Sequence, residues 1–254
     1  GIKPIIGCEM YMAPRSRHDK EGKADRDPSH LVLLARNEVG YRNLLHLVST
    51  AQLEGYYYKP RIDKQLLAEN SEGLVCLSAC IGGELPQAIL RGDMNAAEAV
   101  AREHMEILGP DSYFLELQDH GIPEETDIRA GLLEIARRTG LPLIATNDSH
   151  YIHSDDAAAH DILLCLQTGA RRTDEKRFKF AGPHFSLTGG TEMQRRFAQY
   201  GEAVSNTVAL AARVGFEMKL GQTLLPRYEP IPAGHDADSY LAHLCEQGLY
   251  ERYG

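Results

Sequence analysis

The chain has 254 residues, and its 36 acidic and 27 basic side chains give a formal net charge of −9 at pH 7. Apolar residues make up 43% and charged residues 25%, which is typical of a globular protein and excludes disorder throughout. No apolar run reaches the roughly 18 residues that a membrane-spanning helix needs, and no secretory signal pattern is present. We therefore expect a folded protein with no membrane partner.

The charge balance and the cysteines bear on partners and compartment. An acidic chain does not hold DNA by charge alone, because such binding needs clustered Lys and Arg. Basic spots do occur, and a solvated surface is the ordinary interpretation of them. The five cysteines are odd in number and form no CxxC pair, which favours a reducing compartment, and we expect a cytoplasmic protein. The basic spots are Arg171-Arg172, Lys176-Arg177, Lys179 and Arg195-Arg196.

Short apolar runs alternate with amphipathic stretches along the chain, which predicts strands and helices in turn. Gly140 is expected to end one of these helices, and Ser239 is expected to be the N-cap of the last. The expected strands are 4–12, 30–35, 73–79, 113–118 and 141–146. The expected helices are 41–53, 86–90, 96–108, 124–139, 155–167, 192–200, 202–214 and 239–253.

This alternation predicts an α/β fold with a largely parallel sheet and helices outside it. Five strands are too few to close the usual eight-stranded barrel. Neither end looks like a natural terminus, so we interpret the chain as a piece of a longer protein. If its first strands lie upstream, a barrel is a better prediction than an open sheet. The pattern becomes mainly helical from about Phe178, and the last helix follows a loop at 220–232.

The strongest candidate site residues follow the expected strand 141–146. Asp148 and His150 are two residues apart, so both side chains can point the same way in extended backbone. Functional groups of α/β folds gather at the C-terminal ends of strands, and an Asp with a His can bind a divalent cation. The alternative is a turn, because Asn and Asp favour strand ends for their own backbone hydrogen bonds.

Four further residues are weaker candidates. Glu9 lies in an apolar strand, where a carboxylate is costly unless it is paired or metal-bound, although a solvated face is the alternative. Cys80 ends a strand at a Gly-rich turn and is either a soft ligand or an inert buried thiol. His30 begins its expected strand, where a capping or core role is the ordinary interpretation. His120 also follows a strand and is a candidate for contact with a substrate or with the ligands.

Other kinds of site have no support. No GxxxxGK[ST], GxGxxG or GxSxG motif occurs, so phosphate loops and nucleophile elbows are not indicated. The chain has no Trp and only 7% aromatic residues, which argues against a stacking platform for single strands.

Ten segments of the sequence carry a resemblance to known proteins: 1–9, 30–37, 40–44, 77–80, 113–118, 145–150, 185–187, 202–203, 206–207 and 225–226. The similarity follows the chain in order over nearly its whole length, which makes chance a poor explanation. Together the segments resemble one family, the polymerase-and-histidinol-phosphatase (PHP) domain at the N-terminus of bacterial DNA polymerase III alpha subunits.

The resemblance implies a fold and a metal site. The fold is a distorted TIM-like (β/α)7 barrel of the PHP type, here without its first strands and with a helical C-terminal extension. Residues 1–232 would be the PHP domain and 233–254 the start of the following polymerase region. The family binds divalent metals, often Zn, with Mg or Mn possible, and its ligand positions match Glu9, His30, Cys80, Asp148 and His150. Glu9, Asp148 and His150 would be catalytic. The family's upstream His-x-His and Asp-His-Gly segments, which supply further ligands, are absent.

The resemblance also implies a function. The parent protein would be a Mg-dependent DNA-directed DNA polymerase, a nucleotidyltransferase of chromosomal DNA replication, whose polymerase carboxylates lie beyond this chain. The domain would be a metal-dependent 3′–5′ exonuclease or a scaffold. Its partners would be DNA, a sliding clamp, a clamp loader and a separate proofreading exonuclease. The alternatives are a free-standing PHP phosphoesterase such as a histidinol phosphatase, and an interaction module without catalysis.

Overall fold

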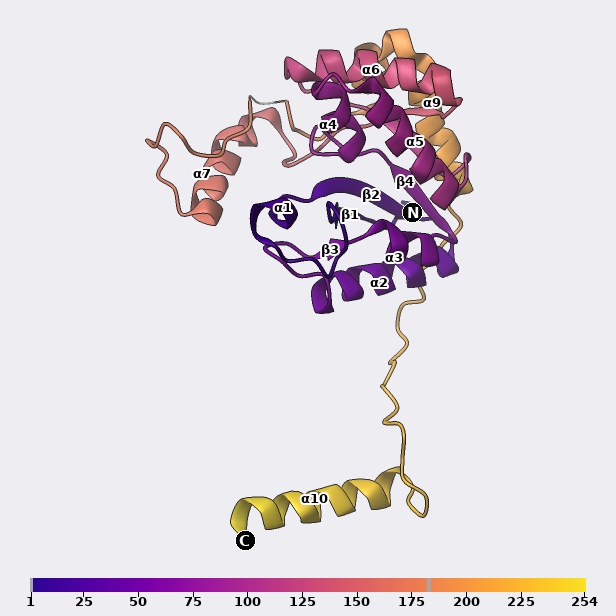
Figure 1. Cartoon of the computed structure of the whole chain (residues 1–254), viewed down its shortest axis with the longest axis vertical. Helices are drawn as coiled ribbons and strands as arrows, with labels where there is room; N and C mark the ends of the chain where they lie inside the picture. The colour runs from indigo at the N-terminus through magenta and orange to yellow at the C-terminus, as the bar shows by residue number, and fades with distance from the viewer. Residues whose placement is uncertain (1, 182–183) are drawn as a thin grey trace. The chain divides into compact units, whose positions relative to one another are not determined.

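The computed structural model describes residues 2–181 and 184–254, which form two compact units, Gly1–Glu217 and Met218–Gly254. The first unit contains a sheet flanked by helices, and the second contains one long helix, α10 (Ala237–Tyr253) (Figure 1). None of the described helices is both long enough and apolar enough to cross a membrane.

A mixed sheet forms the centre of the first unit. Its strands are β1 (Gly7–Met12), β2 (Ser29–Ala35), β3 (Arg61–Ile62), β4 (Leu74–Leu77), β5 (Tyr113–Leu117) and β6 (Leu143–Ala145). They lie in the order β3-β1-β2-β4-β5-β6. The pairs β1–β2 and β2–β4 are antiparallel, and the other three pairs are parallel. The α/β prediction is therefore confirmed, whereas the expectation of a largely parallel sheet holds only away from β2.

The direction of β2 has a structural cause. The connection from β1 to β2 contains only the short helix α1 (Gly22–Arg26), so the chain turns back beside β1 instead of crossing over the sheet. After β2, helix α2 (Glu38–Leu53) leads to β3, which pairs in parallel with β1. Helix α3 (Lys64–Glu69) follows, and β4 then runs antiparallel to β2 on its other side. Such long-range pairing leaves no local sequence signal.

Helices cover both sides of the strands. Helix α2 packs against β2, β3 and β4, while α4 (Glu84–Leu90), α5 (Met94–Leu108) and α6 (Glu124–Thr139) pack on one another across the sheet (Figure 1). Helix α9 (Gly201–Arg213) packs on β6. Strands β4 and β5 are buried at every position, as strands covered on both faces should be, and Glu116 of β5 is the one charged residue among them. The remaining helices of this unit are α7 (Ala157–Thr168), α8 (Gly190–Arg196) and two short 3-10 turns, Ser154–Asp156 and Ala198–Tyr200.

The helix ends test two predictions about caps. Gly140 ends α6 in the left-handed conformation, with φ of 76°, as predicted. The predicted N-cap Ser239 is wrong, because α10 begins earlier and Asp236 is its N-cap. The Asp236 side chain accepts from the backbone N–H of Ser239, and the Ser239 hydroxyl accepts from that of Asp236. Ser239 therefore belongs to the capping box, at its third helical position.

Candidate functional site

Three of the candidate residues meet through one imidazole nitrogen. Glu9 on β1 lies opposite Val32 of β2, so its diagonal neighbour on the same face of the antiparallel pair is His30. His30 Nδ1 lies 3.0 Å from Glu9 Oε1 and 3.6 Å from the Sγ of Cys80. A carboxylate oxygen, an imidazole nitrogen and a sulfur thus converge, although they come from three separate segments.

The turn after β4 explains how Cys80 reaches this place. Ala79 adopts a left-handed conformation, with φ of 64°, which turns the chain sharply after the strand. The backbone N–H of His30 then donates to the carbonyl of Gly82 at 2.9 Å. A Cβ at Gly82 would lie 3.0 Å from His30 Nδ1, so glycine allows the turn to pack against the ring.

The contacts within this cluster favour the protonated form of His30. The hydrogen bond with Cys80, and then that with Glu9, raises the pKa of His30 to about 10. The hydrogen bond from His30 also lowers the pKa of Glu9, and the charge of His150 acts in the same direction. His30 therefore carries a proton at neutral pH and donates it toward its two neighbours. A metal ligand must be a neutral imidazole, so a bound cation would take the place of this proton.

Asp148 and His150 form a second group in the loop after β6. Asp148 Oδ1 lies 3.2 Å from His150 Nε2, and the backbone between them turns, because the N–H of Ser149 donates to the carbonyl of Asn147 at 3.0 Å. The loop is held by His120, whose Nε2 accepts a hydrogen bond from the backbone N–H of Asp148 at 3.1 Å. His120 Nδ1 in turn lies 2.7 Å from Glu125 Oε1. His120 is buried, and its hydrogen bond holds the loop at Asp148.

The sequence analysis did not identify two carboxylates near these residues, Glu116 and Glu125. Glu116 lies in the buried strand β5, where its Oε1 accepts from the hydroxyl of Thr146, and its Oε2 has no hydrogen-bond partner in the described residues. Burial raises the pKa of Glu116. The available signal was a lone carboxylate in an apolar strand, which is the signal that singled out Glu9. Glu125 lies in the acidic first turn of α6, where a carboxylate is ordinary and gives no signal.

The kinds of ligand atom at this site suit a metal ion, but the side chains are not arranged around a single ion. Carboxylate, imidazole and thiolate are the ligands of Zn²⁺, and all three kinds meet at His30. The charge of His150 also acts on Glu9, which links the two groups electrostatically. Even so, residues 2–181 and 184–254 contain no group of three or more His, Cys, Asp or Glu side chains placed to hold one ion. The structure thus shows a triad and a pair in place of a complete coordination shell.

A cavity of about 670 Å³ lies next to the triad and is lined by neighbours of His30, although not by the triad residues themselves. One side of the cavity is lined by Ser29, which precedes His30 in the sequence, and by Gly82, which lies against the His30 ring. The loop between β1 and β2 lines another side, through Arg15 and Ser16. Lys64 and Arg91 add positive charge to the lining and Glu84 adds negative charge, so the cavity is polar.

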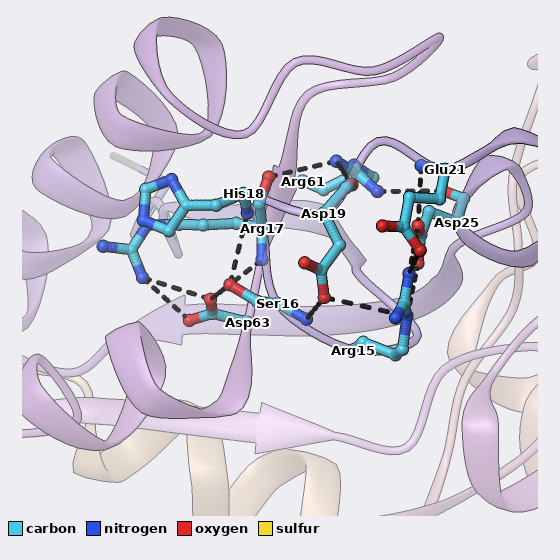
Figure 2. Close-up of polar contacts among 9 residues, drawn as sticks. All are labelled: Arg15, Ser16, Arg17, His18, Asp19, Glu21, Asp25, Arg61 and Asp63. Atoms are coloured by element: carbon cyan, nitrogen blue, oxygen red, sulfur yellow. Dashed lines mark hydrogen bonds and ion pairs between the residues drawn. The ribbon is translucent and has the colours of Figure 1, made fainter.

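The loop that walls this cavity is fixed by a buried guanidinium, that of Arg61 (Figure 2). Arg61 donates to the backbone carbonyls of Arg17, Asp19 and Asp25, at 2.8 to 3.0 Å, and to that of Gly55 at 3.0 Å. A buried charge is tolerated when its hydrogen bonds are satisfied in this way. One side chain of β3 therefore holds several turns of the loop in place.

Two carboxylates, Asp63 and Asp25, also hold the loop between β1 and β2 through hydrogen bonds. Asp63 caps α3 by accepting from the backbone N–H of Leu66, and it also accepts from the backbone and side chain of Arg17. The Arg15 guanidinium donates to both oxygens of the buried Asp25 (Figure 2). The loop is thus tied to β3 and α3 at several points, which gives the cavity a defined wall.

Comparison with known proteins shows the family to which the first part of the chain is similar. Residues 1–120 match the family model of the PHP domain, so this part of the chain belongs to the PHP domain family. Glu9, His30 and Cys80 lie inside the matched region, and Asp148 and His150 lie beyond it.

The particular relatives are DNA polymerase III alpha subunits. The chain is 46% identical to the one from Treponema pallidum, 42% to that from Thermus aquaticus and 40% to that from Mycobacterium tuberculosis. Each comparison covers 100% of the chain but only 22%, 21% and 23% of the relative, respectively. The resemblance noted in the sequence is therefore confirmed along the whole chain, which spans about a fifth of the length of these relatives.

Proposed function

We propose that the chain is the PHP region of a replicative DNA polymerase and that the intact domain is a metal-dependent 3′–5′ exonuclease. The observation that carries this proposal is the convergence of Glu9, His30 and Cys80, at 3.0 and 3.6 Å, from three separate segments. Residues that serve only packing have no reason to bring a carboxylate, an imidazole and a thiol to one point beside a polar cavity.

The ligand set would combine the triad and the pair. Glu9, His30, Cys80, Asp148 and His150 would hold divalent cations, with Zn²⁺ favoured by the thiol and imidazoles and Mg²⁺ or Mn²⁺ by the carboxylates. Bound cations would lower the pKa of a water and hold the oxygens of the scissile phosphodiester. Glu9, Asp148 and His150 would act closest to the reacting phosphate. His120 and Glu125 would keep the Asp148 backbone in place.

The barrel of the PHP type would need strands that this chain does not contain. Strand β1 pairs with β2 along its whole length but with β3 only through Tyr11 and Met12. Within the described residues, the other edge of residues 7–10 has no strand partner, which leaves room for one more strand beside Glu9. A distorted (β/α)7 barrel completed there would bring the family's His-x-His ligands near the triad.

The wider assignment follows the relatives. Residues 1–232 would form the PHP domain, and 233–254 would begin the polymerase region of a cytoplasmic replicase. The polymerase activity, with Mg²⁺, would belong to the parent protein. Its partners would be DNA, a sliding clamp, a clamp loader and a proofreading exonuclease subunit.

A scaffold role is the second candidate, and the lack of a three-donor group in the described residues favours it. Metal analysis of the intact domain after dialysis, together with its hydrolysis of a 3′-labelled oligonucleotide, separates the two functions. The exonuclease predicts bound metal and hydrolysis that are both lost in Asp148→Ala but retained in Asp238→Ala, a change in the first turn of α10. Equal metal content and no hydrolysis in all three proteins would favour the scaffold.

A further inference from the structure

Aromatic rings gather beside the Asp148–His150 pair, although the chain as a whole has few of them. Phe180 contacts the rings of His150, His160 and Phe185, with centroids 4.6, 5.1 and 4.5 Å away. Phe178 adds an edge contact to Phe180 at 5.6 Å. Three of the six phenylalanines in the sequence therefore lie in one cluster, which the overall aromatic content did not indicate.

This cluster borders a cavity of about 330 Å³. Tyr151, His160 and Phe180 supply its aromatic walls, and Leu164 of α7 supplies part of its apolar wall. None of the rings that contact Phe180 is parallel to it, because the interplanar angles run from 38° to 65°. No ring partner in the described residues thus stacks flat on Phe180.

The lining of the cavity carries two basic side chains, Arg177 and Lys179, and one acidic side chain, Asp161, and it belongs in part to a basic stretch of the sequence. Residues 171–179 contain five basic and two acidic side chains, a net charge of +3 within a chain of net charge −9. Arg177 is fixed by a two-point salt bridge to Asp161, at 2.6 and 2.8 Å. Lys179 also lines the cavity and makes no salt bridge to the part of the chain that the structure describes. A planar group with an attached anion matches this combination of rings and cations.

We propose that this cavity binds a nucleobase of single-stranded DNA, stacked on Phe180, with the adjoining phosphate near Lys179. The choice of DNA rests on the proposed function, and the position of the cavity agrees with it. His150 contacts both Phe180 and His160, which line the cavity, so a base bound there would lie next to the Asp148–His150 pair. Every base has a face that stacks on an aromatic ring, so the site would tolerate any sequence.

The observations favour a nucleobase over a peptide of a protein partner. The exposed apolar residues of α7, namely Ile162, Leu163 and Leu166, do not line the cavity. A helix or strand of a partner would need such a continuous apolar surface. The cavity itself is open to solvent and is lined by three rings together with Arg177 and Lys179, which suits one flat group that carries a negative charge.

The absence of Trp from the chain allows a direct test of stacking. The variant Phe180→Trp keeps an aromatic ring in the cavity and adds a single indole reporter. We expect oligothymidylate, added in EDTA to prevent hydrolysis, to quench its fluorescence to saturation. In the control, Leu53→Trp, the reporter lies at the exposed end of α2, and we expect no quenching. Equal quenching in both variants, or none in either, would overturn the proposal.

Affinity measurements with labelled oligothymidylate in the same buffer complete the test. We expect Phe180→Ala and Lys179→Glu to weaken binding about fivefold or more, and Leu166→Ala on exposed α7 to leave it unchanged. Unchanged binding in Phe180→Ala would overturn the stacking site and leave the cavity to a protein segment. Saturable quenching in EDTA without hydrolysis in metal would support the base site while contradicting the exonuclease. Hydrolysis without quenching would do the reverse.

Discussion

His120 and Asp148 are joined by a hydrogen bond that fixes the loop of the second ligand pair. The backbone N–H of Asp148 donates to His120 Nε2 at 3.1 Å, so this nitrogen must be unprotonated and Nδ1 must carry the proton. The Nδ1–H of His120 donates to Glu125 Oε1 at 2.7 Å, and the backbone N–H of His120 donates to Glu125 Oε2. Burial opposes ionisation of Glu125, but the hydrogen bonds from His120 outweigh it, and the pKa of Glu125 is lowered.

Replacing His120 should therefore weaken the site without removing a ligand. His120→Phe keeps a ring against Phe185, on which His120 stacks at 4.4 Å, but it removes the acceptor for the Asp148 N–H. We expect metal affinity to fall about tenfold, the lower end of the range for groups that orient ligands. Isothermal titration with Zn²⁺ measures this. His46→Phe, on the exposed face of α2, is the control, and equal affinities in the two variants would contradict the positioning role.

Arg61 should be the most sensitive residue of the loop beside the cavity. Arg61→Met fills a similar volume but leaves four backbone carbonyls without their donor, so we expect the free energy of unfolding to fall by about 3 kcal/mol. Urea unfolding followed by circular dichroism measures the change. The matched control is Arg42→Met on the exposed face of α2, which should change stability by less than about 0.5 kcal/mol. Similar losses in both variants would show that the carbonyls find other donors.

The ion pair of Arg15 and Asp25 gives a prediction about acid stability. The hydrogen bonds from Arg15 lower the pKa of Asp25 from 3.8 to about 2. A lowered folded pKa stabilises the fold above the unfolded value, and this contribution is lost as the pH falls through the folded value. The stability difference between the native chain and Asp25→Asn should thus be constant at neutral pH and shrink between pH 3.8 and about 2. Urea midpoints across this range measure it, and a difference that does not vary with pH would contradict the ion pair.

Gly82 should control the state of His30. In Gly82→Ala the new methyl group would lie about 3.0 Å from His30 Nδ1, so the ring or the turn must move. We expect weaker hydrogen bonds to Cys80 and Glu9, and a pKa of His30 that falls from about 10 toward its ordinary value. NMR titration of the imidazole C–H signals measures this in metal-free protein. Gly83→Ala is not a suitable control, because a Cβ there meets backbone; Gly189→Ala, which meets open space, is. An unchanged pKa in Gly82→Ala would show that the turn does not set the contact.

The sequence predicted the parts of the site that depend on local pattern. The spacing of Asp148 and His150 indicated that both side chains can point the same way, and they lie 3.2 Å apart; Gly140 predicted the end of α6. It did not predict β3, because two residues carry no periodicity, although Arg61 on that strand holds the whole loop. The antiparallel direction of β2 depends on pairing between distant segments.

The same limit applies to the ligands and their supports. From the residues alone, Glu9, His30 and Cys80 had ordinary structural interpretations, and only the family resemblance grouped them. Their contact arises from a strand register and a left-handed residue, Ala79, which no local motif announces. The aromatic cluster around Phe180 escaped prediction because composition averages over the chain, whereas folding collects a few rings in one place.

Cobalt binding tests most directly whether the triad is a metal site. Co²⁺ replaces Zn²⁺ readily, and a thiolate ligand gives it a charge-transfer band in the near ultraviolet, which can be followed in an excess of the ion. We predict that the native chain and Cys245→Ser, a change at an exposed cysteine of α10, show this band and that Cys80→Ser does not. The absence of the band from the native chain, or its persistence in Cys80→Ser, would contradict metal binding at Glu9, His30 and Cys80.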